Sequence, residues 1–248
     1  MSGHSKWATI KHKKAATDAK RGKIFSNLAK ELTVAARSGG GDPGSNITLR
    51  TILGKCKAVN MPSENIERAI KKGTGALQGE ALEEIIFESY APGGIGMIIV
   101  CLSDNRNRSV AEVRHALQRA NATLAGTNQV MRNFQRKGQI LVDAEGVDED
   151  ALMEAALEAG ADDVTNEDGT FEILTAPGAY NEVSDKLTNA GYKLSEESGV
   201  NMIPSVWNAI TDKAQAESIL KLVDTLEELE DVQHVYTTAD IAPEAMPE

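Results

Sequence analysis

Residues 138–175 read GQILVDAEGVDEDALMEAALEAGADDVTNEDGTFEILT and carry the pattern that decides the fold. The apolar run at residues 140–142 is typical of a strand, and Asp148 can cap a helix whose apolar positions recur through Ala159. Residues 171–174 are strand-like again after a turn rich in Asp and Gly. A strand, a helix and two further short strands are therefore expected here.

The alternation continues to residue 203. Pro177 opens a second helix with Tyr180, Val183 and Leu187 on one face, and residues 192–202 supply a last extended segment. The resulting order is βαββαβ, which is the ferredoxin-like motif. Residues 138–203 are predicted to form a complete unit.

The flanking segments are incomplete by comparison. Residues 83–102 indicate two strands joined by a glycine turn, and Ser109 to Glu112 has the pattern of a capping box that starts a helix. A further strand is possible around residues 130–134. After residue 204 come one strongly amphipathic helix and the strand-like residues 232–236.

The first flanking segment has two strands and one helix, and the second has one helix and one strand. Neither is a complete α+β unit, so we infer that the two segments form one unit together. The predicted domains are residues 1–76, residues 77–137 joined with 204–240, and residues 138–203 as an insertion. The first domain has helical periodicity only, with a helix starting near Lys23 and two more before Gly73. A shorter helix from Lys13 to Arg21, ended by Gly22, and a basic arm before it are also expected. The fold class is α+β.

Charge is strongly segregated along a chain whose net charge is −11. Residues 1–73 hold 15 Lys and Arg against 5 Asp and Glu, whereas residues 141–248 hold 4 against 26. A basic segment on an acidic protein indicates a surface for an anionic polymer. The alternative is a solvated helix face. Aromatic residues are only 4% of the chain, which favours recognition of backbone and shape over base stacking, with Trp7 as the possible exception.

A second basic stretch supports the same interpretation. Arg106 and Arg108 are predicted to stand just before a helix N-terminus, where free N–H groups favour anions. The alternative is that these arginines pair with Asp104 or Glu112. The predicted nucleic-acid-binding residues are Lys6, Trp7, Lys11, His12, Lys13, Lys14, Lys20, Arg21, Lys23, Lys30, Arg106 and Arg108.

Other kinds of site are not indicated. The four histidines have no metal-ligand spacing, the glycines at residues 93–96 lack the Lys of a phosphate loop, and no nucleophile motif occurs. We expect no catalytic residue, metal, cofactor or small-molecule substrate. The longest apolar run, Ile95 to Leu102, is too short for a membrane, so a cytoplasmic protein with no membrane partner is expected. Cys56 and Cys101 are expected to be reduced core residues.

Several long motifs resemble the YebC family over essentially the whole chain. They are GHSKWATIKHKKAATDAKRGKIF at the start, GGGDP, NMPSENIERAIKKGTG, YAPGGIGMIIV, SDNRNRSVAEVRHA and MIPS. The resemblance implies three domains around a cleft, with two α+β domains after a helical one, and a non-enzymatic role in gene expression. Members of this family are described as DNA-binding transcriptional regulators or as ribosome-acting factors that relieve stalling.

The chain departs from the family pattern at residues 127–130 and at Ile47-Thr48. Our hypothesis is a monomeric translation factor that binds ribosomal RNA. A DNA-binding transcriptional regulator is the alternative. A metal-dependent nuclease in the inter-domain cleft and an acidic protein that binds a basic partner are the more distant ones.

Overall fold

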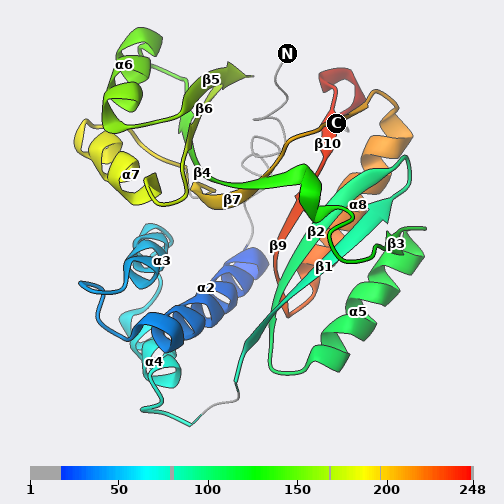
Figure 1. Ribbon diagram of the computed structural model, residues 1–248, viewed down its shortest axis with the longest axis horizontal. Helices are drawn as coiled ribbons and strands as arrows, with labels where there is room; N and C mark the ends of the chain where they lie inside the picture. The colour runs from blue at the N-terminus through cyan, green and yellow to red at the C-terminus, as the bar shows by residue number, and fades with distance from the viewer. Residues whose placement is uncertain (1–17, 79–80, 168, 196, 247–248) are drawn as a thin grey trace.

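The computed structural model describes residues 18–78, 81–167, 169–195 and 197–246, and Figure 1 shows their three structural units. The first unit contains only helices among its described residues: α2 (Asp18–Gly39), α3 (Ile47–Ala58) and α4 (Ser63–Gly73). Its core is formed by Leu28 and Leu32 of α2, with Leu49 and Cys56 of α3. Gly73 allows the close approach of α4, because a Cβ there would lie 2.4 Å from the Thr33 carbonyl oxygen.

Helix α2 passes through Gly22, so the prediction that Gly22 ends a helix is wrong. A glycine inside a helix costs about 1 kcal/mol relative to alanine. The packing of Leu28 and Leu32 further along the same helix is large enough to offset that cost. Residues 18–21 of the predicted Lys13–Arg21 helix belong to α2, and the rest of that helix and the predicted basic arm lie outside the described residues.

The second unit is a four-stranded antiparallel sheet covered on one face by two helices. Its strands run in the order β3-β1-β2-β9. The elements are β1 (Glu83–Ala91), β2 (Ile95–Ser103), α5 (Arg106–Arg119), β3 (Thr123–Leu124), α8 (Lys213–Glu228) and β9 (Val232–Thr237). One buried cluster joins the sheet to both helices, from Ile85 and Met97 to Leu117, Ile219 and Val235.

The glycine turn between β1 and β2 is confirmed, with positive φ at Gly93 and Gly94. The capping box predicted at Ser109 is wrong. Helix α5 begins earlier, at Arg106, because the Asn105 side chain accepts a hydrogen bond from the Arg108 N–H at 3.1 Å.

The further strand predicted around residues 130–134 is instead the 3-10 helix η1 (Met131–Asn133). The carboxylate of Glu88 accepts hydrogen bonds from the N–H groups of Asn128, Val130 and Met131. In a strand, these N–H groups would donate to the carbonyl groups of a neighbouring strand. Because they donate to Glu88 instead, the pairing of β4 begins only at Phe134.

The third unit has the predicted βαββαβ order. Its elements are β4 (Phe134–Asp143), α6 (Glu149–Ala159), β5 (Asp163–Glu167), β6 (Thr170–Thr175), α7 (Tyr180–Asn189) and β7 (Gly199–Pro204). The strand order β5-β6-β4-β7 is ferredoxin-like. Asp148 caps α6 as predicted, with its side chain 2.9 Å from the Ala151 N–H.

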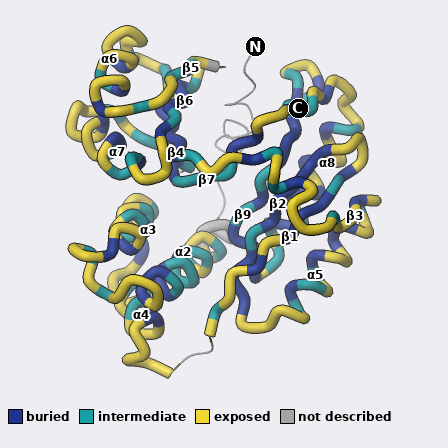
Figure 2. The backbone as a smooth tube through the Cα atoms, in the orientation of Figure 1, coloured by how far each residue is buried: buried dark blue, intermediate teal, exposed yellow. Residues whose placement is uncertain are grey.

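The α+β fold, with a helical N-terminal unit and one α+β unit inserted in another, is confirmed. Four short elements were not predicted. They are the strand β3, the parallel pair β8 (Asn208–Ile210) and β10 (Ala239–Ile241), and the 3-10 helix η2 (Pro243–Ala245). Figure 2 shows that the buried positions gather inside each unit and that much of the outer surface of α3, α5 and α6 is exposed.

We propose that the inserted domain extends from residue 134 to residue 204. Its two ends lie together, because the Ser205 N–H donates to the Asn133 carbonyl at 2.7 Å. The strands beside those ends, β4 and β7, also pair from Phe134 with Pro204. Insertions whose ends are adjacent can often fold alone.

A fragment of residues 134–204 should therefore melt cooperatively, because its core is complete. A fragment of residues 81–133 should not, since residues 205–246 supply 12 of the 23 residues in its buried cluster. Residues 81–133 joined to 205–246 by a short Gly-Ser linker should recover the cooperative melt, measured by circular dichroism. A cooperative transition in the isolated 81–133 fragment would contradict the proposed boundaries.

Candidate nucleic-acid interface

The predicted interface residues fall into three groups. Six of them lie outside the described residues, namely Lys6, Trp7, Lys11, His12, Lys13 and Lys14. Lys20 and Arg21 belong to the first turn of α2, and their side chains are not among those described. The structure gives geometry for the remaining four, which are Lys23, Lys30, Arg106 and Arg108.

Lys30 and Arg108 meet at one buried carboxylate, that of Asp231, which directly precedes β9. The Asp231 side chain is only 2% exposed. Lys30 Nζ lies 3.1 Å from Asp231 Oδ1, and Arg108 Nη2 lies 3.0 Å from both carboxylate oxygens. The hydroxyl groups of Ser103 and Ser109 donate to Oδ2 at 2.8 and 2.9 Å. Two cations and two hydroxyls therefore enclose one anion.

The physical effect of this arrangement is to keep Asp231 ionised inside the protein. Burial raises the pKa of Asp231, but the hydrogen bonds from Ser103, Ser109, Lys30 and Arg108 outweigh it and leave the pKa below its ordinary value of 3.8. The hydrogen bonds to Asp231, and then that to Asp104, raise the pKa of Arg108. Arg108 also contacts Asp104 at 2.8 Å, so the alternative of carboxylate pairing is correct for this arginine.

The pairing of Arg108 with carboxylates offsets an unfavourable interaction between a cation and the dipole of α5. Arg106 and Arg108 lie inside the first helical turn, not before it as predicted, and a cation there opposes the helix dipole by roughly 0.3–1 kcal/mol. Asp231 supplies to the Arg108 side chain the negative charge that the sequence analysis assigned to an external phosphate.

Helix α2 contacts the segment before β9 along one face, with contacts at residues 23, 27 and 30. Lys23 Nζ donates to the Leu229 carbonyl, and Lys30 Nζ donates to the Glu230 carbonyl at 2.9 Å. Burial, and then the nearby Lys30 charge, lower the pKa of Lys23. Since Lys23 and Lys30 hold the helical unit on the second unit, they are removed from the cations that we assign to a polyanion.

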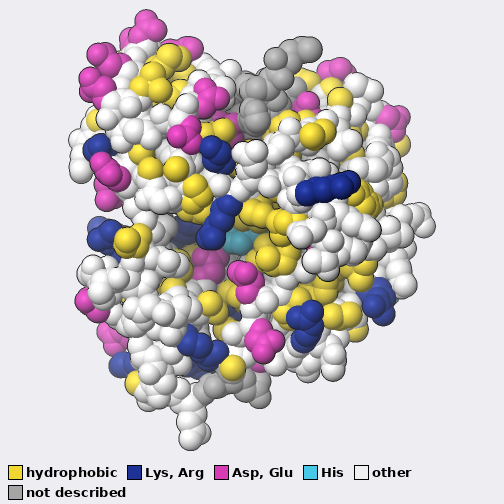
Figure 3. Space-filling model, in the orientation of Figure 1, with side chains coloured by type: hydrophobic (Ala, Val, Ile, Leu, Met, Phe, Trp, Pro, Cys, Tyr) yellow, Lys and Arg dark blue, Asp and Glu magenta, His cyan; other side chains and the backbone are white. Residues whose placement is uncertain are grey.

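A second polar side-chain contact extends this interface. His234 Nε2 lies 3.3 Å from Glu31 Oε1, and the His234 ring stacks on Tyr236 with centroids 5.8 Å apart. The contact to the third unit is smaller, with the Thr51 hydroxyl 2.6 Å from Asn181 Oδ1. Figure 3 shows that the surface is hollowed where the units meet, with a histidine and both kinds of charged side chain inside the hollow.

Exposed cations remain on other surfaces. Arg106 is exposed at the first position of α5. Helix α3 exposes Arg50 and Lys57 on one face, a pair that the sequence analysis missed although their spacing of seven residues places them two turns apart. Among the described residues no ion pair holds these three cations, whereas Arg68 and Lys71 pair with Glu64 and Glu67 on their own helix.

The two thiols are buried and free, as predicted. Burial raises the pKa of Cys56 to about 11 and that of Cys101 to about 12, so neither thiol is activated. Across the described part of the chain, His, Cys, Asp and Glu side chains do not gather in threes that could hold a metal ion. No described helix combines the length and apolar character that crossing a membrane requires.

These features define a class of modular α+β protein, in which a basic helical unit is fixed by a buried ion-pair cluster to two units that bear most of the acids. The chain belongs to the TACO1/YebC family. Residues 5–76 match the model of the TACO1/YebC protein N-terminal domain, and residues 82–239 match that of the TACO1/YebC second and third domain. The resemblance seen in the sequence motifs is confirmed.

Similar proteins span the full chain. Proteins named probable transcriptional regulatory protein from Treponema pallidum (strain Nichols) and Geobacter sulfurreducens are each 50% identical, covering 98% and 99% of this chain and 99% and 98% of their own. The crystal structure of a conserved hypothetical protein from Aquifex aeolicus has a TM-score of 0.88 at 44% identity, covering 98% of this chain and all of that one.

Replacing Asp231 by Asn should lower the free energy of unfolding by about 3–5 kcal/mol, because two cations then lose their buried partner. The matched control is Asp162→Asn, which removes the exposed pair with Lys137 and should cost less than about 1 kcal/mol. Urea denaturation measures both values. Similar losses in the two variants would contradict the role assigned to Asp231.

The same variant has a predicted pH dependence. Because the pKa of Asp231 is lowered on folding, its contribution is complete above the ordinary pKa of 3.8 and is lost as pH falls through the folded value. The stability difference between the wild type and Asp231→Asn should therefore shrink when denaturation is repeated below pH ~4.

Proposed function

We propose that this protein is a nucleic-acid-binding regulator of gene expression that acts without catalysis. The observation that carries the proposal is the charge segregation, a net of +10 in residues 1–73 against −22 in residues 141–248. A polyanion is attracted to the first segment and repelled by the second, so it can contact the protein on one side only. The regulatory names of the relatives agree with this role.

Hydrogen bonds between the units narrow the set of cations that we assign to phosphate contacts. Lys23, Lys30 and Arg108 hold the units together, so we assign phosphate contacts to the remaining predicted residues and to Arg106. We add Arg50 and Lys57, because they form an exposed basic face on α3. The helical unit would then bind phosphates through α3 and the segment before α2. Helix α2, which contacts the second unit, would fix the position of the helical unit relative to it.

Ribosomal RNA is the target that we favour. Phe25 is half-buried against the core of the helical unit, so the described part of this unit offers no obvious platform for stacked bases. Contacts to phosphates on an irregular folded RNA need no such platform and no regular groove. The acidic units would extend away from the RNA while the basic unit anchors the protein.

Duplex DNA is the second candidate, and the names of the relatives favour it, since they describe transcriptional regulators. A DNA regulator would use the same basic unit. A factor that binds ribosomal RNA would be found with ribosomes in the cell, whereas a DNA-binding regulator would be found at promoters. This difference can be measured directly.

The first prediction concerns Lys11, Lys13, Lys14 and Lys20. Their joint replacement by Glu should abolish binding to a labelled RNA hairpin and to a DNA duplex. For the wild type, the logarithm of affinity should fall with the logarithm of salt by about 0.9 per phosphate contacted on duplex DNA, and by about 0.7 on a single strand.

The matched control reverses the four lysines of the acidic segment, Lys186, Lys193, Lys213 and Lys221, which changes the net charge by the same amount. This control should retain at least a large part of the affinity. Equal losses in both quadruple variants would mean that net charge alone matters, and the assignment of the interface would fail.

A separate prediction distinguishes the two targets. If ribosomal RNA is the target, the protein should cosediment with ribosomes at moderate salt, and a deletion strain should show altered ribosome occupancy on particular messages with unchanged mRNA levels. Normal ribosome profiles, together with mRNA changes at promoters that the protein occupies, would instead establish the DNA target.

A further inference from the structure

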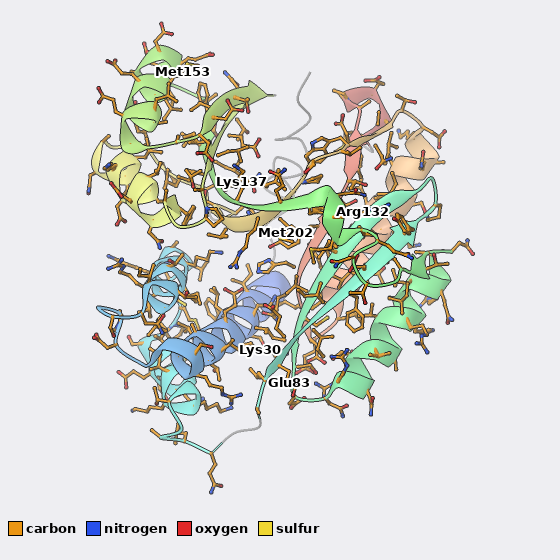
Figure 4. The ribbon with its side chains drawn as sticks, in the orientation of Figure 1. Lys30, Glu83, Arg132, Lys137, Met153 and Met202 are labelled. Carbon is orange, nitrogen blue, oxygen red and sulfur yellow. The ribbon has the colours of Figure 1, made fainter. Side chains whose placement is uncertain are left out.

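The segment that joins the two sheets exposes a second group of cations. Residues 131–137 contain Arg132, Arg136 and Lys137, and both arginines are exposed while Lys137 is half-buried. Figure 4 shows Arg132 and Lys137 along the strand that crosses between the second and third units. We name this segment the connecting ridge.

The arginines of the connecting ridge have no carboxylate partner within the described part of the chain. Lys137 pairs with Asp162 at 2.9 Å, but among the described residues no ion pair engages Arg132 or Arg136. Residues 141–248, which follow the ridge, carry 26 acids against 4 cations. Exposed arginines without an ion-pair partner are available to an external anion.

The ridge is held in place by buried contacts on both sides. The Glu88 carboxylate accepts hydrogen bonds from the Asn128, Val130 and Met131 N–H groups at 2.6, 2.7 and 2.8 Å. Val130 is fully buried and Phe134 is 7% exposed. The backbone that carries Arg132 is therefore fixed immediately before and after it.

The Glu88 carboxylate is suited to this role. Burial raises its pKa, but the three backbone hydrogen bonds outweigh burial and lower the pKa overall. Glu88 thus stays ionised and holds the loop at residues 128–131, which departs from the family pattern. A fixed backbone reduces the entropy that ordering the arginine side chains would otherwise cost on binding.

Backbone pairing places Arg136 next to the junction of the units. Arg136 is opposite Met202 in the β4–β7 pair, so both side chains lie on the same face of the sheet. Met202 packs against the cluster of Ile98, Val130 and Phe134, which joins the two sheets. Four residues of chain span at most roughly 14 Å, so Arg132 and Arg136 can reach one stretch of polymer backbone.

We propose that the connecting ridge is a second phosphate-binding surface, which contacts the phosphodiester backbone of the same nucleic acid that the helical unit anchors. The proposal rests on the proposed function and specifies that the junction of the second and third units meets the polymer. Arg132 and Arg136 supply the contacts, and Glu88 positions the segment.

The test uses the full chain with Arg132→Glu and Arg136→Glu together, titrated against a labelled RNA hairpin and a DNA duplex. Affinity should fall by at least about tenfold, and the log–log salt slope should become less steep by roughly 1.4–1.8, the value for two lost phosphate contacts. The conservative pair Arg132→Lys and Arg136→Lys should keep most of the slope, because the charges remain.

The matched control is Arg114→Glu with Arg119→Glu on α5. Both of these arginines are exposed and lie in the second unit, as Arg132 does, and their replacement gives the same change in net charge. Helix α5 packs on the face of the first sheet that carries the main core, whereas the ridge packs on the other face. The control should keep the wild-type salt slope.

The ridge variant and the quadruple lysine variant together distinguish failure of the ridge proposal from failure of the proposed function. Equal effects of the two double variants, or an unchanged slope in the ridge variant, would overturn the ridge proposal. If the ridge variant binds normally while the quadruple lysine variant does not, the proposed function stands and the ridge proposal fails. If the wild-type protein binds neither nucleic acid, both fail.

Discussion

A carboxylate buried without cations costs several kcal/mol, and Asp231 is buried at the point where the helical unit meets the second unit. That cost is avoided only while Lys30 of α2 and Arg108 of α5 remain in place. The two hydroxyls that complete the cluster, of Ser103 and Ser109, come from the end of β2 and the start of α5. The relative position of three elements is therefore set by one ionised group.

This constraint divides the cations of the protein into two classes. Lys23, Lys30 and Arg108 are structural, because their partners are carbonyl oxygens and carboxylates of the second unit. The exposed cations of α3 and of the connecting ridge are the ones that we assign to external anions. A surface map of charge alone would treat both classes alike. Hydrogen-bond partners and burial separate them.

Local sequence patterns were sufficient for most of the fold. The βαββαβ order follows from periodicity within residues 138–203, and the insertion follows from the incompleteness of its flanks. The start of α5 was misplaced because Asn105 and Ser109 are both good capping residues, and side-chain hydrogen bonding to Asp231 decided between them. The continuity of α2 through Gly22 depended on packing that lies further along the chain.

The candidate site was less predictable, for a physical reason. Lys30 and Asp231 are 201 positions apart, and Arg108 and Asp231 are 123 apart, so no local pattern links them. The sequence left open whether Arg108 meets an external anion or a carboxylate of the protein, and it could not identify Asp231 as a partner. Arg50 and Lys57 could have been found from their spacing, since α3 was predicted.

We propose that a nucleic acid contacts the basic side of this protein and avoids its acidic side. Ultraviolet crosslinking in cells, followed by sequencing of the bound nucleic acid and mapping of the crosslinked peptides, is the decisive experiment. We expect ribosomal RNA attached to residues 1–73 and to the connecting ridge, with residues 141–248 unmodified. Crosslinks concentrated in residues 141–248, or no crosslinked nucleic acid at all, would contradict it.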